Sequence, residues 1–374
     1  MQHNKPLFLC ILSCLFACTW AQLNAQVYPT DYKSALKLLK LKEYAVSVAK
    51  SDSIYFLSTI PDKKKKTIVF CQGSGPQPLV INLKEGLCGV FPFRVDSAAR
   101  NEFNIVIVSK PGLKRYATDD DLAADLARQA QYLQLDSMNR PPKKYTDNNK
   151  LYKLGGDCIQ VIKFLRQQPW VDNDNIYIYG HSQGAVVAAY VAATDPQDIK
   201  KVIYSQGNAY GVYAGYLSSI IYNQESTPDV NKKLDSIYSI HSSLIDGKPD
   251  KEMAELYQWK EADLVDKKNN DFYDLYYGGW RSLEEPTAID YLLKINCPVL
   301  LVQGLNSPAD MDNKNIPLDF ARHHKKNLTT LFYPGYDHNF FKCATDEHGN
   351  PKAPEFHWDD VFSDVKAWIK KSNL

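Results

Sequence analysis

Short apolar runs alternate with amphipathic stretches from about residue 50 onwards. Runs such as 67–71 and 104–109 have continuous apolar stretches at 68–71 and 105–108, which is typical of strands that are covered on both faces. The expected strands are 53–60, 67–71, 104–109, 175–179, 201–205, 298–302 and 329–333. The expected helices are 120–135, 152–168, 183–193, 318–324 and 359–371. Repeated strand-then-helix units predict an α/β fold with a mainly parallel, doubly wound sheet and helices on both faces.

The composition is that of a globular protein, with 44% apolar, 12% aromatic and 23% charged residues among 374. This length exceeds one average domain but fits a single large α/β domain with an insertion. Lys and Arg number 44 and Asp and Glu number 43, so the net charge is +1. Such a balance gives no global attraction to nucleic acid or to anionic lipid, and no nucleic-acid partner is expected.

Residues 1–25 are expected to be a signal peptide. Lys5 is the only charge before an apolar run of about 11 residues, which is too short for the roughly 20 that span a bilayer. A small residue at the −1 position places cleavage before Gln26, and the mature protein is then secreted or periplasmic. The alternatives are a buried N-terminal helix, or lipoprotein processing with an anchor at Cys14. No transmembrane span is expected in the rest of the chain.

Five cysteines follow this leader, namely Cys71, Cys88, Cys158, Cys297 and Cys343. None of them forms a CxxC pair or a zinc-finger pattern with histidine, so no structural metal is expected. An odd number leaves at least one thiol free or paired between chains. One disulfide is compatible with an oxidising compartment, but the sequence leaves its partners open.

The strongest chemical signal is the segment Gly180–Gly184, which reads Gly-His-Ser-Gln-Gly between an expected strand and an expected helix. This is the G-x-S-x-G pattern in the strand–turn–helix context that a nucleophilic serine requires. The turn is so tight that flanking side chains would collide, whereas the Ser182 hydroxyl is expected to stand clear at the edge of the sheet. The helix N-terminus below favours the negative charge that develops during acyl transfer.

Here the sequence resembles the α/β-hydrolase family, and in particular its secreted bacterial serine esterases and acyl hydrolases. The resemblance covers most of residues 53–371 and implies an α/β-hydrolase domain over 26–374 with a helical cap insertion at about 208–288. It is supported by Phe70–Pro76, a Gly-rich loop after an early strand, where the family has its oxyanion loop with a His in place of Gln72. By this match the oxyanion would be bound by the N–H groups of Ser74 and Gln183.

The resemblance also identifies a base. Pro334–Phe340 follows the last short strand and contains His338 where the family has its catalytic histidine. Neutral His338 would take the proton of Ser182 and return it to the leaving group. His181 is expected to point away from the site, although it is next to the serine.

The triad acid is less well defined. The family has G-x-x-D after the strand 298–302, but Ser307 occupies that Asp position here. The next carboxylates are Asp310, which we expect to be the acid, and Asp312, its alternative. Both could instead be solvated loop aspartates, with the site degraded or its acid supplied by another strand.

These residues predict a serine hydrolase that cleaves carboxylic esters through a Ser-His-Asp triad and an acyl-enzyme. The expected partner is a small-molecule ester or acyl substrate, and no metal or organic cofactor is expected. The aromatic rings of 208–288 would line the pocket or form the core of the cap, and 27–50, with leucines at helical spacing, would pack on the outside of the domain. The alternatives are a small peptidase or amidase of the same fold, or a non-catalytic binding protein. The sequence does not determine the oligomeric state.

Overall fold

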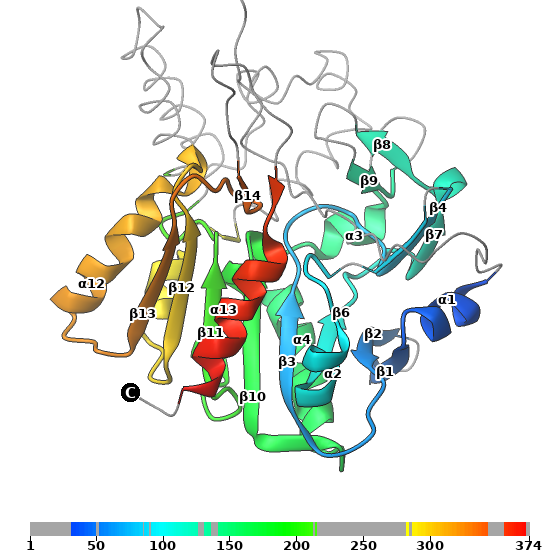
Figure 1. The fold of residues 1–374 in the computed structure, drawn as a ribbon, viewed down its shortest axis with the longest axis horizontal. Helices are drawn as coiled ribbons and strands as arrows, with labels where there is room; N and C mark the ends of the chain where they lie inside the picture. The colour runs from blue at the N-terminus through cyan, green and yellow to red at the C-terminus, as the bar shows by residue number, and fades with distance from the viewer. Residues whose placement is uncertain are drawn as a thin grey trace, which may run out of the picture.

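The computed structural model describes residues 31–49, 52–84, 86–89, 91–125, 131–135, 141–211, 214, 282–283, 286–342 and 355–371 (Figure 1). The expected signal peptide 1–25 and almost all of the expected cap at 208–288 lie outside these residues. Within them, none of the helices is long and apolar enough to cross a bilayer.

The core of the fold is an eight-stranded sheet in the order β1-β2-β6-β3-β10-β11-β12-β13. The strands β6, β3, β10, β11, β12 and β13 run parallel to one another, whereas β2 pairs antiparallel with β1 and β6. The bounds are β1 Leu41–Ala49, β2 Asp52–Thr59, β3 Lys65–Cys71, β6 Phe103–Val108, β10 Val171–His181, β11 Lys201–Ser205, β12 Val299–Gly304 and β13 Leu328–Tyr333. The central strands are buried along almost their whole length, as their continuous apolar runs predict.

Helices cover both faces of this sheet (Figure 1). On one face lie α4 (Leu151–Arg166), α5 (Gln183–Thr194) and α11 (Ala288–Leu292), and on the other lie α2 (Ser97–Glu102) and α13 (Trp358–Lys370). The remaining helices are α1 (Tyr32–Leu38), η1 (Asp119–Asp121), α3 (Lys143–Asn148), η4 (Pro308–Asn315) and α12 (Ile316–Arg322). The prediction of a mainly parallel, doubly wound α/β sheet is therefore confirmed.

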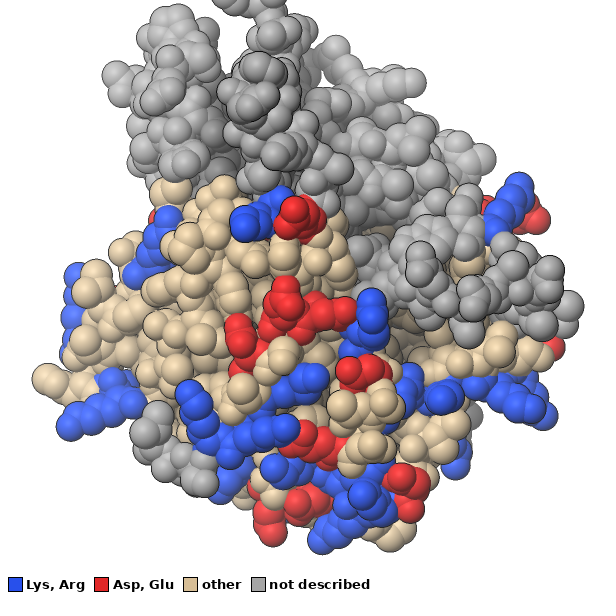
Figure 2. Space-filling model, in the orientation of Figure 1, with Lys and Arg blue, Asp and Glu red and all other residues tan. Residues whose placement is uncertain are grey.

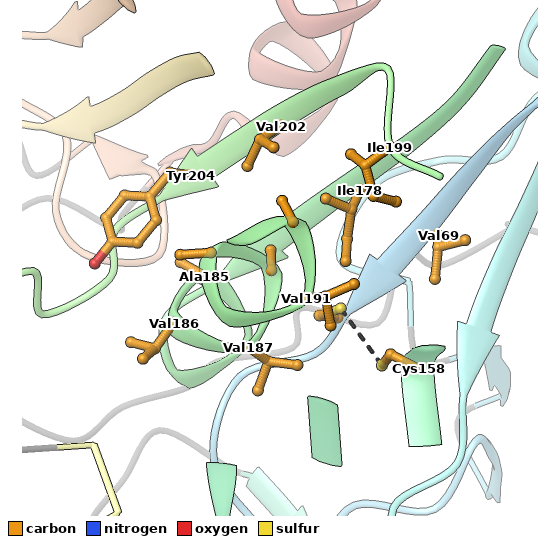
Figure 3. Packing of buried hydrophobic residues seen from close by; sticks show 14 of the residues in the cluster. Val69, Cys158, Ile178, Ala185, Val186, Val187, Val191, Ile199, Val202 and Tyr204 are labelled. Atoms are coloured by element: carbon orange, nitrogen blue, oxygen red, sulfur yellow. Dashed lines mark hydrogen bonds between the residues drawn. The ribbon is translucent and has the colours of Figure 1, made fainter. Parts of the chain in front are cut away.

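The helix that follows the candidate nucleophile packs closely on the centre of the sheet. Small side chains of α5 such as Ala185 and Val191 lie against Val69, Ile178 and Val202 of the neighbouring strands (Figure 3). Nine of the twelve residues of α5 are buried. Such burial on all sides fixes the helix, and therefore fixes the turn from which it starts.

Two expectations about local structure are wrong. The segment 120–135 is not a helix, because it contains η1 and the paired strands β8 (Ala123–Asp125) and β9 (Gln131–Leu133). The backbone N–H of Gln134 donates to the Pro76 carbonyl over 2.9 Å, a long-range bond that an extended chain can make and a local pattern cannot reveal. Among its described residues, 31–49, the stretch 27–50 is helical only in α1, since β1 forms the edge of the main sheet.

The other strands form small sheets outside the main one. They are β4 (Val80–Leu83), β5 (Gly86–Gly89) and β7 (Tyr116–Thr118), which form a three-stranded sheet, and β14 (Phe341–Lys342) and β15 (Glu355–Phe356), which pair with each other. On the face that carries α13, basic and acidic side chains are interspersed (Figure 2).

Candidate active site

Ser182 occupies the sharp turn between β10 and α5. Its backbone has φ 56° and ψ −126°, in a region that residues with a side chain rarely adopt. The Ser182 N–H donates to the carbonyl of Ser205 at the end of β11 over 2.9 Å, which ties the turn to the neighbouring strand. A strained conformation held by its surroundings is a feature of functional sites and of the nucleophile elbow.

The two glycines of the motif allow this turn. A Cβ on Gly180 would lie 2.6 Å from the Cα of Ala185, and a Cβ on Gly184 would lie 2.7 Å from the carbonyl oxygen of Gln72. Both distances are far shorter than real contacts of a Cβ atom. The expected collision of flanking side chains is thus observed, and Gly184 also brings α5 directly against the end of β3.

The Gly-rich loop after β3 lies next to this elbow. Its Ser74 is half-buried, and the side chain of Gln72 donates to the Val108 carbonyl over 3.3 Å. The ammonium group of Lys110, which follows β6, donates to the carbonyls of Gly73 and Gly75. The loop is therefore fixed to the end of β6 by its own Gln72 side chain and by the side chain of Lys110.

Gln183 opens α5 and is buried. Its side chain donates to Asn149 Oδ1 over 3.2 Å, which turns the amide group towards the segment between α3 and α4. Its backbone N–H belongs to the first turn of α5, where N–H groups have no partner within the helix. Such a group is suited to bind an oxyanion.

His338 lies in the turn that follows β13 and is half-buried. The preceding residue shapes this turn, because Asp337 Oδ1 accepts the backbone N–H groups of Asn339 and Phe341, each over 2.8 Å. The carbonyl of Asp337 accepts a bond of 2.9 Å from the side chain of Gln206, which follows β11. The turn is therefore joined to the loop that follows β11, two strands away in the sheet.

His181 contacts the candidate base, contrary to the expectation that it points away from the site. Its ring centroid lies 5.2 Å from that of His338, and the ring packs edge-on against Trp358 at 4.7 Å. Burial, and then the nearby charge of His338, hold the pKa of the His181 imidazole well below its usual range. His181 is therefore neutral, and it links the elbow to the turn that carries His338.

The candidate acids lie in η4, after β12. Ser307, in the position where the family has Asp, is buried and precedes the helix. The backbone of Asp310 is in η4, but its side chain lies outside the described part of the structure, whereas Asp312 is half-buried. Asn313 fixes this segment, since its buried side chain donates to Gln303 Oε1 over 2.9 Å and accepts the N–H of Ala209.

The sequence-derived candidates all follow parallel strands at their carboxyl ends. Ser74 follows β3, Ser182 and Gln183 follow β10, Asp310 follows β12 and His338 follows β13. In a parallel sheet these ends meet at one edge, which is where α/β folds bind their ligands. Sequence reasoning missed Lys110, Asp337 and Asn313, which hold the loops in place, because their roles depend on partners far away in the sequence.

The described residues contain no group of three or more His, Cys, Asp or Glu side chains that could hold a metal ion.

The family model described as the prolyl oligopeptidase family matches residues 144–244, a span that includes α4, β10, α5 and β11. No curated protein matches the sequence. The chain is similar to several solved structures. Dipeptidyl peptidase 4 of Porphyromonas gingivalis has a TM-score of 0.50 and 11% identity, over 89% of this chain and 35% of that protein. Est1E of Butyrivibrio proteoclasticus has a TM-score of 0.45 and 13% identity, over 87% of this chain and 97% of that one.

The acylaminoacyl peptidase of Pyrococcus horikoshii has a TM-score of 0.44 and 15% identity, over 83% of this chain and 40% of that protein. The chain thus spans well under half the length of the two peptidases. The sheet order, the elbow after β10 and the likeness to the dipeptidyl peptidase show that the chain has the α/β-hydrolase fold. The stretch that matches the prolyl oligopeptidase model contains the candidate nucleophile, Ser182.

Proposed function

We propose that this protein is a serine hydrolase that cleaves carboxylic esters through an acyl-enzyme. The observation that carries the proposal is the backbone of Ser182, which has a positive φ of 56° at the start of α5. At Gly180 and Gly184, on either side of this serine, there is no room for a Cβ atom. An ordinary turn has no need of this strain, whereas a nucleophilic serine must stand above the sheet with a helix N-terminus beneath it. Ser182 occupies that place, although it is buried, at 8% exposed, and not open to solvent as the sequence predicts.

In the proposed mechanism Ser182 Oγ attacks the ester carbonyl while neutral His338 takes its proton. The oxyanion of the tetrahedral intermediate is bound by the N–H groups of Ser74 and Gln183. The intermediate collapses, the C–O bond to the alcohol breaks, and protonated His338 gives its proton to the leaving alkoxide. Water then attacks the acyl-enzyme by the same route and releases the carboxylic acid.

The acid that orients His338 is proposed to be Asp310, with Asp312 as the alternative. Both belong to η4, which Asn313 anchors beside β11 and β12. A carboxylate in this position would keep the imidazole in the tautomer that accepts the serine proton and would stabilise the imidazolium. Asp312 is a reasonable alternative because it directly precedes Asn313, the residue that anchors η4.

Labelling with a fluorophosphonate probe tests the proposal, because the probe reacts only with an activated serine. We expect the wild type to be labelled and Ser182→Ala to remain unlabelled while keeping the wild-type melting temperature. A panel of nitrophenyl esters of increasing acyl chain length would then measure the size of the pocket. A folded wild type that neither reacts with the probe nor hydrolyses any ester would favour the non-catalytic binding protein instead.

A peptidase or amidase is the second candidate, and the match to the prolyl oligopeptidase model favours it. An ester is the less demanding substrate, since its alkoxide leaves more readily than an amine. Hydrolysis of aminoacyl or dipeptidyl nitroanilides by the wild type that is lost in Ser182→Ala would establish the peptidase. Ester hydrolysis with no release of nitroaniline would support the esterase.

We also propose that the protein acts outside the cytoplasm after removal of 1–25. The supporting pattern is the single charge at Lys5 followed by a short apolar run. Intact mass measurement of the protein expressed with its own leader would show a chain that begins at Gln26. A lipidated chain that begins at Cys14 would instead establish a membrane-anchored lipoprotein.

A further inference from the structure

Lys110 is a buried lysine beside the loop that is proposed to bind the oxyanion. Its exposed fraction is 5%, and its ammonium group donates to the backbone carbonyls of Gly73 and Gly75, the latter over 3.0 Å. The ring of Tyr145 lies on the same group, with its centroid 5.8 Å from Nζ. Removing a charge from water is unfavourable, and the two carbonyls and the tyrosine ring together compensate for the burial of the Lys110 ammonium group.

We propose that Lys110 is a positioning residue for the oxyanion hole, an inference that rests on the serine hydrolase function proposed above. The carbonyl of Gly73 and the N–H of Ser74 belong to one peptide unit. In a planar trans peptide these two groups point in opposite directions. Because the Gly73 carbonyl is turned towards Lys110, the Ser74 N–H is turned away from it, and Lys110 thereby sets the direction of this donor.

The hydrogen bond from Lys110 to the Gly75 carbonyl holds the loop but does not orient any N–H donor. It reaches the carbonyl of Gly75, whose peptide partner is Pro76, a residue that has no N–H. Gly75 has a φ of +107°, which favours glycine, so the loop makes its turn at this point. The loop is also close to the elbow, because a Cβ on Gly184 would collide with the carbonyl of Gln72. The loop therefore contacts α5 near Gln72, and it contacts Lys110 at Gly73 and Gly75.

The charge of Lys110 adds to this effect. A cation on the Gly73 carbonyl polarises the peptide unit and strengthens the Ser74 N–H as a donor. The negative charge of the tetrahedral intermediate would develop on the far side of the same unit. Preorganised dipoles and charges of this kind stabilise the transition state more than the ground state.

The test is Lys110→Met, which removes the donors and the charge but keeps an unbranched stem. Lys201→Met is the matched control, because Lys201 is also 5% exposed and also donates to backbone carbonyls, those of Ile369 and Lys371 near the end of α13. It lies at the start of β11, at the opposite end of the sheet from Ser182. Both variants are expected to melt at a lower temperature than the wild type.

For Lys110→Met we expect kcat for nitrophenyl ester hydrolysis to fall by roughly 10- to 100-fold, with KM within about twofold of wild type. The affinity for a trifluoromethyl ketone, which forms a tetrahedral adduct with an oxyanion, should fall by a similar factor. Lys201→Met should retain both values. Hydrogen exchange of the amides in 72–79 should be faster in Lys110→Met than in Lys201→Met.

Equal kcat and equal ketone affinity in the two lysine variants would overturn the inference, since Lys110 would then have only a structural role. A fall in kcat/KM that comes entirely from a higher KM, with kcat unchanged, would also overturn the inference. A wild type that does not react with fluorophosphonate would overturn the serine hydrolase proposal itself, and the role in the oxyanion hole with it. If the wild type is active but Lys110→Met is unaffected, only the role of Lys110 fails, so the failures of the two proposals are distinguishable.

Discussion

The imidazole rings of His181 and His338 lie 5.2 Å apart from centroid to centroid. The first ring belongs to the end of β10, directly before the candidate nucleophile, and the second belongs to the turn after β13. Nε2 of His181 also lies 3.4 Å from Asn339 Oδ1, next to the candidate base. Two loops that are more than 150 residues apart in sequence are thus joined through a buried, neutral imidazole.

Burial of His181 should make the protein less stable in mild acid. Its pKa in the folded state is held well below its usual range by burial and by His338, whereas in the unfolded state it is about 6.5. Below pH 6.5 the unfolded chain therefore binds a proton that the folded chain excludes. The contribution of this residue is complete above pH 6.5 and is lost as the pH falls below that value.

Urea unfolding between pH 5 and 8 would measure this contribution. In His181→Phe, which keeps an aromatic ring against Trp358, we expect the free energy of unfolding to fall less steeply below pH 6.5. The difference in slope should be at most about 1.4 kcal/mol per pH unit. Identical slopes in the two proteins would show that His181 is not responsible for the acid sensitivity.

Gly184→Ala should disrupt the elbow. The new Cβ would lie 2.7 Å from the carbonyl oxygen of Gln72, so α5 and the Gly-rich loop would have to move apart. We expect the free energy of unfolding to fall by about 1–3 kcal/mol and kcat/KM to fall by about 100-fold or more. Chemical denaturation and ester hydrolysis would measure the two effects.

Gly156→Ala in α4 is the matched control, because nothing lies within 4 Å of the Cβ it would add. This change should stabilise the protein by about 0.5–1 kcal/mol, since alanine is the better helix former, and should leave kcat unchanged. If Gly184→Ala behaved like Gly156→Ala, the close approach of α5 to the loop would have no role in the reaction.

Substitutions in η4 should identify the acid of the triad. We expect Asp310→Asn to lower kcat by up to about 10⁴-fold and Asp312→Asn to have a small effect. The reverse result would assign the role to Asp312. Because an amide can hold the imidazole in the wrong tautomer without unfolding the protein, melting temperatures should stay close to that of wild type. Two near-neutral variants would mean that the acid comes from elsewhere, or that none is needed.

The thiols of Cys71 and Cys158 should be unreactive in the folded protein. Their sulfurs are 3.8 Å apart and both side chains are buried (Figure 3). The contact with Cys71, together with burial, raises the pKa of the Cys158 thiol well above its usual range, so little thiolate is present at pH 8. Iodoacetamide should therefore modify both residues in guanidinium chloride and neither in buffer. Rapid modification in buffer would contradict this.

The sheet and the elbow could be predicted from the sequence because their signals are local. The run 105–108 is apolar at every position, and the two glycines of Gly180–Gly184 mark a turn that is too tight for flanking side chains. The residues that hold the loops could not be predicted in this way. Lys110 is an ordinary lysine in the sequence, and its role follows from carbonyls more than 30 residues away. The helix expected over 120–135 failed for the same reason, since a distant bond to Pro76 favours an extended chain.

Asp337 offers a test of how strictly the turn around His338 must be shaped. One carboxylate oxygen accepts the N–H groups of Asn339 and Phe341, so removing it leaves two donors without this partner. Asp337→Ala should let the turn relax, and a displacement of about 1 Å at a catalytic group can lower the rate by about 10²-fold. We expect kcat for ester hydrolysis to fall by that order while KM changes little.

Asp337→Asn separates shape from charge, because the amide oxygen can accept the same two hydrogen bonds while the negative charge is lost. If the role of Asp337 is to shape the turn, the asparagine variant should retain most of the wild-type kcat. If the asparagine variant is as slow as the alanine variant, the charge itself must matter to His338. The pH dependence of kcat/KM would then shift as well, since a negative charge next to an imidazole raises its pKa and its removal lowers it.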